Sequence, residues 1–372
     1  MAIGFIRFLA TLLALVLATP AWAATPSRAA CEAWLATSPS PAGLATLTGP
    51  GATQRAALLA SGSKLVLIGS RYYSVSIPSA FYTAAKPMLV FDLHGTGGYP
   101  EAEWTDWNAA MTARGHAFVA LAWGGGTPSA VSDTEIYASA TQIMQEVGAN
   151  CPIAAANKWL MGFSVGSAMS FAVMIRDVAG LRLFRGQLAI SGAAAAPLTT
   201  GRDVMHATVE ASRANSQAVK GILSWMYCGE QDLDHSWSMC TEMPNGVAFV
   251  NEHGGQATLY SDTMGMHHSL PASSTGYNQM FDYMAAAPAT TVVTAAQADC
   301  LFDAAERVYP ALLAPAASPT LTYAPYRYRY YSGTRAYLGV STTDEHLYYL
   351  PPSGPMQDVG LGLTYVDQTS CR

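Results

Sequence analysis

The sequence predicts an α/β fold with a mostly parallel central sheet covered by helices on both faces. Along residues 65–285, short runs rich in apolar and β-branched residues alternate with longer segments of helical spacing, which is the order of β-α-β units. Several of the short runs are almost wholly apolar, as in strands that are buried on both faces. Crossovers between such parallel strands are expected to be right-handed.

The predicted elements follow one another in a regular order. Two paired strands are expected first, at 65–68 and 72–77, because both runs are rich in β-branched and aromatic residues. A buried strand at 87–93 precedes a helix at 101–114, which Gly115 ends. The other predicted elements are strands at 116–123, 159–161, 186–190, 222–227 and 257–260 and helices at 133–147, 167–175 and 277–284.

Composition and charge exclude several classes of partner. Of the 372 residues, 51% are hydrophobic and only 12% are charged, so the chain can bury a large core. The net charge is −6, and no basic run or stripe exists, which argues against a nucleic-acid partner. No Cys-x-x-Cys or His-Glu-x-x-His spacing supports a metal site. We therefore expect a monomer that uses no metal or organic cofactor.

The N-terminus has the features of a secretory signal peptide. Arg7 precedes an apolar run from Phe8 to Ala18, and small residues at Ala21 and Ala23 form a cleavage site. The apolar run is too short to span a bilayer, so the mature protein should begin at Ala24 without a membrane span. We expect a secreted protein, extracellular or periplasmic.

Six cysteines remain after this cleavage, and an even number in an exported chain suggests three disulfides. Cys228 and Cys240 lie close in the sequence, and Cys300 and Cys371 bound one local region, so each pair is plausible. The pair that then remains is Cys31 with Cys151.

A reactive serine is predicted at Ser164. Residues 162–166 read Gly-Phe-Ser-Val-Gly, between a predicted strand and a predicted helix. Small residues two positions to either side allow a sharp turn that exposes the serine hydroxyl, and the helix N-terminus favours a developing oxyanion. In a chain with 32 glycines this pattern could also be a plain glycine-rich turn, but the strand-turn-helix context favours a nucleophile.

A second glycine-rich segment follows the buried strand at 87–93. Residues 94–98 read His-Gly-Thr-Gly-Gly, which lets backbone N–H groups turn toward a bound carbonyl. We predict an oxyanion hole made by the N–H groups of Val165 and Thr96. His94 is interpreted as a structural residue of this loop, and a simple strand-to-helix turn is the alternative.

The acid and the base should follow the serine in that order. Asp232 and Asp234 come just after the predicted strand at 222–227, and Glu230 is a third possibility. The alternative for each is a solvated acidic turn.

Histidines at two later positions could supply the base. His267 and His268 lie after the strand at 257–260, where adjacent side chains point in different directions. His235 is less suitable because it shares a loop with the acids.

These segments resemble the extracellular polyhydroxybutyrate depolymerase and feruloyl-esterase-like family of α/β hydrolases. The resemblance covers about residues 65–285 and implies an α/β-hydrolase fold. It is carried by the run 87–98, the turn 162–166, a Gly-x-x-Asp step that selects Asp232, and a Gly-Met-x-His-x-x-Pro step that selects His268. The chain departs from the family where Leu270 replaces a frequent Trp and His267 a frequent Gly, which bears on substrate more than on mechanism.

The expected chemistry is acyl transfer. His268 would take the proton of Ser164, Asp232 would orient the imidazole, and water would release the acyl group. A carboxylic ester is the expected substrate, in a polyester such as polyhydroxybutyrate or in a small molecule. The alternatives are an amide hydrolase acting on a poly-amino-acid such as polyaspartate, a feruloyl or acetyl esterase acting on plant polysaccharide, and a non-catalytic polymer-binding protein. Four tryptophans could contact an apolar substrate or lie in the core: Trp104, Trp107, Trp123 and Trp237.

The chain beyond the hydrolase region is predicted to form a second module. The expected division is a signal peptide at 1–23, a catalytic domain at 24–284 that opens with a weakly specified lead-in at 24–60, a linker at 285–298 and a Cys-bounded module at 299–372. A helix at 301–308 precedes a Tyr-rich stretch at 323–349, expected to form a small β-containing module. Its tyrosines could bind a polymer, but strand alternation favours a core role for every second one.

Overall fold

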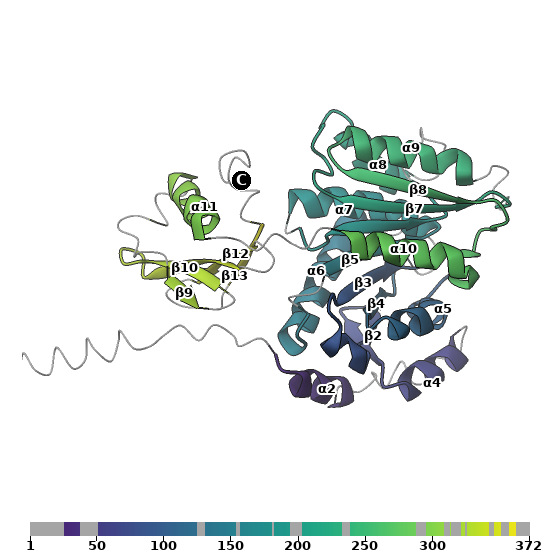
Figure 1. Ribbon diagram of the computed structural model, residues 1–372, viewed down its shortest axis with the longest axis horizontal. Coiled ribbons are helices and arrows are strands. Elements are labelled where there is room, and N and C mark those ends of the chain that lie inside the picture. The colour runs from purple at the N-terminus through teal and green to yellow at the C-terminus, as the bar shows by residue number, and fades with distance from the viewer. Residues whose placement is uncertain are drawn as a thin grey trace, which may run out of the picture.

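The larger of two sheets has eight strands and forms the centre of the hydrolase region (Figure 1). In this computed structural model the described residues are 26–37, 51–124, 131–153, 157–180, 182–193, 203–232, 239–287, 295–308, 313, 321–323, 326–341, 346–350 and 357–361. The predicted signal peptide at 1–23 lies outside them, as do Asp234, His235, Trp237 and Cys371. Within the described ranges, no helix combines the length and the apolar character that a membrane crossing needs.

The strand order of this sheet is β1-β2-β4-β3-β5-β6-β7-β8. β2 runs antiparallel to both of its neighbours, and the other neighbouring pairs are parallel. A mostly parallel sheet with a serine turn between β5 and the next helix is the α/β-hydrolase fold, as predicted. The strands are β1 Lys64–Ile68, β2 Arg71–Ser76, β3 Met88–Leu93, β4 Ala117–Leu121, β5 Asn157–Phe163, β6 Gly186–Ile190, β7 Leu223–Gly229 and β8 Gln256–Asp262.

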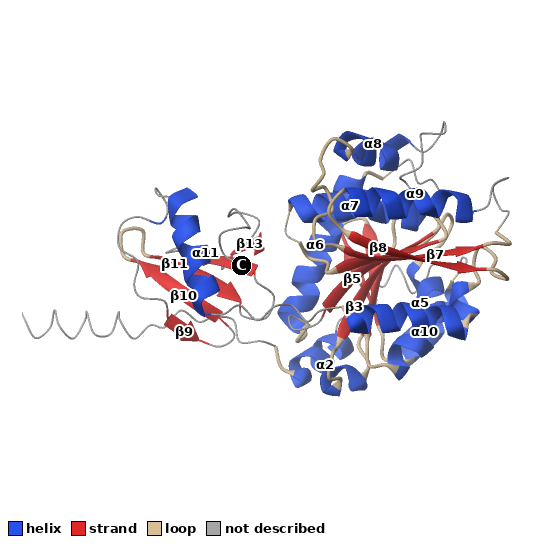
Figure 2. Cartoon of the chain, turned by 45° about the horizontal axis from the view of Figure 1, so that its top comes forward, coloured by secondary structure: helices blue, strands red, loops and turns tan. Residues whose placement is uncertain are grey.

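Helices cover both faces of the sheet, and each face has its own apolar cluster (Figure 2). One face packs on α6, α7 and α9, and the other on α4, α5 and α10. Every residue of β3 is buried, which agrees with the nearly continuous apolar run. The helices are α2 Arg28–Thr37, α4 Ala52–Ala60, α5 Pro100–Ala113, α6 Asp133–Asn150, α7 Val165–Ala179, α8 Asp203–Ser212, α9 Met239–Glu252 and α10 Ser274–Ala286, with short 3₁₀ turns at Ser79–Thr83 and Leu270–Ala272.

Four helices were not predicted: α2, α4, α8 and α9. The lead-in at 24–60, interpreted from the sequence as weakly specified, contains two of them. α9 includes Pro244, a residue that disfavours helix interiors. The helix forms because Met243, Phe249 and Val250 are buried against the sheet, so packing outweighs local preference.

Two of the predicted disulfides are present. Cys31–Cys151 joins α2 to the end of α6, across 120 residues, and Cys228–Cys240 joins the end of β7 to α9. Cys300 is disulfide-bonded too, whereas Cys371, its predicted partner, lies outside the described residues. Across the described residues, no group of three or more His, Cys, Asp or Glu side chains could hold a metal ion.

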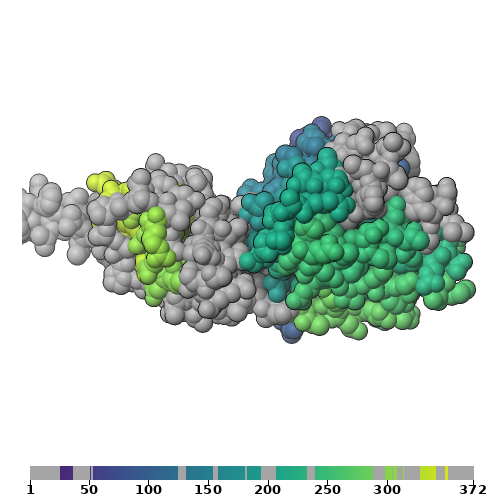
Figure 3. Space-filling model, turned by 90° about the horizontal axis from the view of Figure 1, so that it is seen from above, coloured from purple at the N-terminus to yellow at the C-terminus, as the bar shows by residue number. Residues whose placement is uncertain are grey.

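A separate five-stranded antiparallel sheet follows in the C-terminal region, with the order β13-β12-β11-β10-β9. Helix α11, Ala295–Val308, begins inside the predicted linker 285–298 and is visible on the surface of this module (Figure 3). It packs on one face of the sheet, where Tyr331 is buried against Phe302 and its neighbours. The strands are β9 Leu321–Tyr323, β10 Tyr326–Tyr331, β11 Ala336–Ser341, β12 His346–Leu350 and β13 Gln357–Leu361.

Strand alternation divides the tyrosines of β10 between the two faces of this sheet. Tyr331 is in the core, as expected, and its hydroxyl donates a hydrogen bond to Glu306 of α11. Tyr328 and Tyr330 belong to the opposite face, are half-buried, and both contact the ring of Tyr337. The core role therefore applies to one set of tyrosines only.

Candidate active site

Ser164 occupies a strained turn at the end of β5. Its φ of 54° and ψ of −118° are rarely adopted by a residue with a side chain, and the surrounding backbone holds it there. A Cβ on Gly162 would lie 2.2 Å from the carbonyl oxygen of Gly166, and a Cβ on Gly166 would lie 1.9 Å from that of Leu93. The glycines of the Gly-x-Ser-x-Gly segment are therefore required by close backbone contacts.

The structure brings Ser164, His267 and Asp232 together. Nε2 of His267 lies 2.9 Å from Oγ of Ser164, and Nδ1 of the same ring lies 2.6 Å from Oδ2 of Asp232. A carboxylate at this distance favours the tautomer in which Nδ1 carries the proton, which leaves Nε2 free to accept the serine proton. Asp232 is buried, and the imidazole is 16% exposed.

The sequence-based choice of His268 as the base is wrong for this geometry. Nε2 of His268 lies 3.1 Å from Oδ2 of Asp106 on α5, and its side chain is 50% exposed. The two histidines are consecutive, so their side chains leave the backbone in different directions, and only the ring of His267 fits between Ser164 and Asp232. Phe163 contacts both imidazoles, with ring centroids 5.0 Å and 4.8 Å away.

The loops that carry Asp232 and His267 are joined by backbone contacts. They follow β7 and β8, which pair up to Gly229 and Asp262. The N–H of Gln231 donates to the carbonyl of Gly265 at 2.9 Å, and a Cβ on Gly229 would lie 2.3 Å from that same oxygen. This close approach fixes the distance between the loops of Asp232 and His267.

His94 connects the loop after β3 to the end of β4 through hydrogen bonds of its ring. The N–H of Trp123 donates to Nε2 of His94 at 3.1 Å, so Nδ1 must carry the proton, and it lies 2.8 Å from the carbonyl oxygen of Gly95. Burial lowers the pKa of His94 and keeps the ring neutral, as this arrangement needs. The structural role expected of His94 agrees with these contacts.

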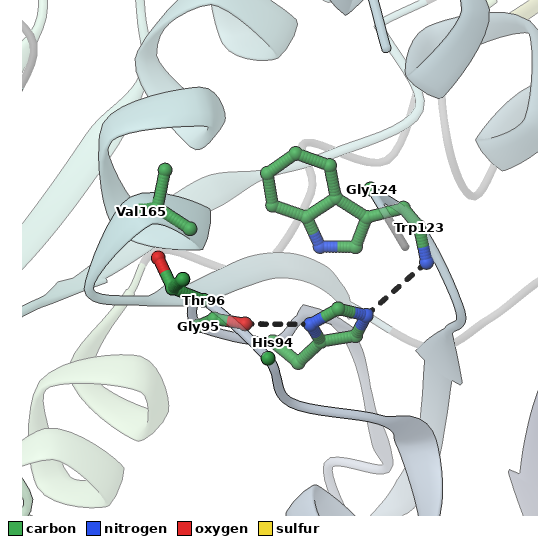
Figure 4. A pocket seen from close by; sticks show the side chains of 7 residues that line it. His94, Gly95, Thr96, Trp123, Gly124 and Val165 are labelled. Carbon is green, nitrogen blue, oxygen red and sulfur yellow. Dashed lines mark hydrogen bonds between the residues drawn. The ribbon is translucent and has the colours of Figure 1, made fainter. Parts of the chain in front are cut away.

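A small, open hollow lies beside the serine turn (Figure 4). Thr96 and Val165, the two residues predicted to form the oxyanion hole, both line it. Val165 is the first residue of α7, where backbone N–H groups lack partners within the helix and the dipole favours negative charge. Seven residues line the hollow: His94, Gly95, Thr96, Gly97, Trp123, Gly124 and Val165.

The other residues singled out in the sequence lie elsewhere. Glu230 accepts a hydrogen bond from the hydroxyl of Ser261 at 2.7 Å and belongs to a different contact from that of Asp232. Trp104 and Trp107 are buried in the apolar cluster under α5, so they are core residues. Trp123 is also buried, yet it lines the hollow.

Known structures resemble this chain at low sequence identity. No protein-family model matches it, and no curated protein matches it either. It is similar to Est1E from Butyrivibrio proteoclasticus, with 11% identity and a TM-score of 0.43 over 60% of this chain and 99% of that one. An arylesterase gives 11% identity and a TM-score of 0.47 over 60% of this chain and 81% of that one. The structure of a fungal esterase from Rhizomucor miehei gives 13% identity and a TM-score of 0.44 over 70% of this chain and 96% of that one.

Sequence reasoning missed a group of three acidic side chains near the loop at 94–98. Asp92 of β3 is wholly buried, Glu103 of α5 is nearly so, and Asp106 lies one turn further along α5. Burial, followed by the nearby charges of Glu103 and Asp106, raises the pKa of Asp92 well above its usual value. Burial is the main cause that raises the pKa of Glu103 to about 7, and the negative charge of Asp106 is the second cause. The hydrogen bond from His268 to Asp106 raises the pKa of His268.

Replacing Glu103 with glutamine is expected to stabilise the protein in alkaline solution. The folded state holds a proton on Glu103 up to a pKa of about 7, whereas the unfolded chain loses it near 4.5, so the free energy of unfolding falls as the pH rises between these values. Glu103→Gln should remove this decline, which is on the order of 3 kcal/mol. Thermal melting at pH 5 and pH 8 measures it, with the exposed Glu252→Gln as a control. An unchanged pH dependence in Glu103→Gln would contradict the assignment.

Proposed function

We propose that this protein is an exported serine hydrolase that cleaves carboxylic esters through an acyl-enzyme. The observation that supports it most is the continuous contact from Ser164 through His267 to Asp232. In the proposed reaction, His267 removes the proton of Ser164 as its Oγ attacks the ester carbonyl, and Asp232 stabilises the imidazolium that forms. His267 then donates this proton to the departing alcohol, and a water molecule deprotonated by the same ring releases the acid.

The oxyanion is proposed to bind to the N–H groups of Val165 and Thr96. Both residues line the hollow, which supports this assignment, as does the N-terminus of α7 behind the serine. The hydrogen bonds of His94 to Gly95 and Trp123 would hold the loop of Thr96 in position before substrate binds. Little reorganisation of the N–H donors would then be needed during the reaction.

The surroundings of the site favour an uncharged substrate over a polyanion such as polyaspartate. The segments that carry the site residues, 87–113, 162–175, 223–232 and 263–281, contain no Lys or Arg. A polyanion would need cations near the scissile bond. Met264 and Met266 on the loop of His267 are 80% and 63% exposed, which suits contact with an apolar polyester or acyl chain.

A fluorophosphonate probe tests the nucleophile directly. We expect covalent labelling of the mature protein and turnover of short p-nitrophenyl esters, both lost in Ser164→Ala. Ser167→Ala is a matched control, since its buried hydroxyl is bound to the carbonyl of Gly192 and should not react. Polyester granules, feruloyl esters and polyaspartate offered alongside would separate the ester and amide alternatives. Absence of both labelling and turnover would favour the non-catalytic binding protein.

A further inference from the structure

A carboxyl group of α5 is buried beside the loop at 94–98 with one of its oxygens unbonded. Glu103 is 4% exposed, and its Oε2 has no hydrogen-bond partner among the described residues. An ionised carboxylate costs far more free energy to bury than a neutral carboxyl group, so this environment favours the protonated form. The proposed reaction makes no use of Glu103, and its position therefore calls for an explanation.

Glu103 contacts the loop that carries Thr96. The backbone N–H of Gly95, the residue before Thr96, donates a hydrogen bond to the carboxyl group of Glu103. Gly95 also packs closely on the serine turn, because a Cβ at this position would lie 2.8 Å from the ring of Phe163 and 3.2 Å from Cβ of Ser164. A single stretch of backbone thus contacts both Glu103 and the serine turn.

Three elements place titratable groups near Glu103. Asp106 lies one turn further along α5, Asp92 is wholly buried in β3, and His268 lies on the loop after β8, 3.1 Å from Asp106. Burial, followed by the charge of Asp106, raises the pKa of Glu103 to about 7, while the charge of His268 and the N–H of Gly95 act in the opposite direction. β4, on which α5 also packs, contains no titratable side chain.

The polar groups of two other neighbouring elements contact a different acid of the same helix. Arg55 of α4 lies 2.8 Å from Glu101, and the hydroxyl of Tyr72 in β2 donates to Glu101 at 2.9 Å. Residues two apart in a helix point to different sides, so Glu101 and Glu103 have separate surroundings. The segments 87–113 and 263–281 contain no Lys or Arg. Ionisation of Glu103 therefore adds a negative charge to a region that already holds Asp106.

We propose that ester hydrolysis requires the neutral form of Glu103, because its carboxylate, in contact with the loop of Thr96, would oppose the negative charge that develops on the ester carbonyl oxygen. This inference rests on the proposed esterase function. The N–H groups of Thr96 and Val165 are the proposed donors to that oxyanion, and a like charge buried against the same loop would destabilise it, since water screens it poorly there. Glu103 thus acts on the reaction through the loop.

The pH dependence of kcat/KM tests the proposal, since this quantity reports groups that titrate in the free enzyme. Glu103→Gln keeps the shape and an acceptor for the N–H of Gly95 but cannot ionise. With p-nitrophenyl butyrate, the ratio of kcat/KM of Glu103→Gln to that of the wild type should rise from about one at pH 5.5 to about tenfold at pH 8.5. The midpoint should lie near pH 7. This ratio cancels the titration of His267, which both enzymes share, and circular dichroism at each pH checks that both stay folded.

Two further variants complete the test. The exposed Glu252→Gln should give a ratio near one at every pH. His268→Ala removes a positive charge that acts on Glu103, so the decline of kcat/KM in this variant should move to higher pH.

The proposal is overturned if kcat/KM of the wild type does not fall between pH 7 and pH 8.5, even if Glu103→Gln does not fold. A fall that persists in Glu103→Gln, or that His268→Ala leaves in place or moves to lower pH, overturns it too. Failure of the proposed function looks different, because then no ester would be hydrolysed and Ser164 would not be labelled at any pH.

Discussion

Replacing His267 with alanine is expected to lower kcat for a soluble p-nitrophenyl ester by about 10⁴-fold or more. The imidazole contacts both Oγ of Ser164 and the carboxylate of Asp232. Without it the serine hydroxyl keeps its proton, because Asp232 is too far away to act on it directly. Steady-state kinetics with the purified variant measures the loss, and circular dichroism checks the fold.

His268→Ala is the matched control, one residue further along the same loop. Its ring is half-exposed and pairs with Asp106 on α5, so we expect a loss below about tenfold and a wild-type rate of labelling of Ser164 by the fluorophosphonate. A change in KM would reflect a small shift of the loop. If His268→Ala were the inactive variant and His267→Ala the active one, the proposed proton transfer would be wrong.

The sequence was sufficient to locate the segments of the site but not all of its side chains. That Ser164 and Asp232 lie near each other could be predicted because each follows a buried strand, and parallel strands bring their C-terminal ends to one edge of a sheet. The loop at 94–98 follows β3, which neighbours β5 in the sheet, so its place beside the serine follows from the same rule.

The sequence-based choice selected the histidine of the adjacent pair that does not contact Ser164, for a definable reason. His267 and His268 lie in a loop, where no periodicity fixes the direction of a side chain. The deciding contacts lie outside the pair itself: Gly265 against Gly229, the N–H of Met266 bonded to Oγ of Ser269, and the ring of Phe163 in contact with both imidazoles. The spacing taken from the resemblance selected His268. In this chain the preceding position, usually a glycine in the family, is a second histidine, His267.

The proximity of the buried acids Asp92 and Glu103 could not be predicted from the sequence either. Asp92 and Glu103 looked like ordinary members of an apolar strand and a helix, and nothing in the local sequence placed them side by side. Their proximity depends on α5 packing on β4 beside β3, with Pro100 at the start of the helix and Trp104 and Trp107 in the core. Pairing of distant charged residues is therefore evident only after the layers have formed.

The largest expected effect on stability comes from Gly166→Ala, which should prevent native folding of the hydrolase region. The new Cβ would lie 1.9 Å from the carbonyl oxygen of Leu93 and 2.7 Å from that of His94, and both are backbone atoms. The clash could be relieved only by moving α7 away from β3, which would separate Ser164 from the loop of Thr96. Backbone overlap of this kind at the centre of the sheet should cost more than about 4 kcal/mol.

Gly148→Ala provides the comparison, because it makes the same chemical change within α6. A Cβ there would meet only side-chain atoms of Ile153, at 3.9 Å and 4.0 Å, and alanine favours a helix interior over glycine by about 1 kcal/mol. We therefore expect Gly148→Ala to melt at or slightly above the wild-type temperature and to keep full activity, while Gly166→Ala should lack a cooperative melting transition. A folded and active Gly166→Ala would show that helix and strand can move apart without disturbing the nucleophile, and the requirement for glycine two residues after Ser164 would then have to be explained without the contact to Leu93.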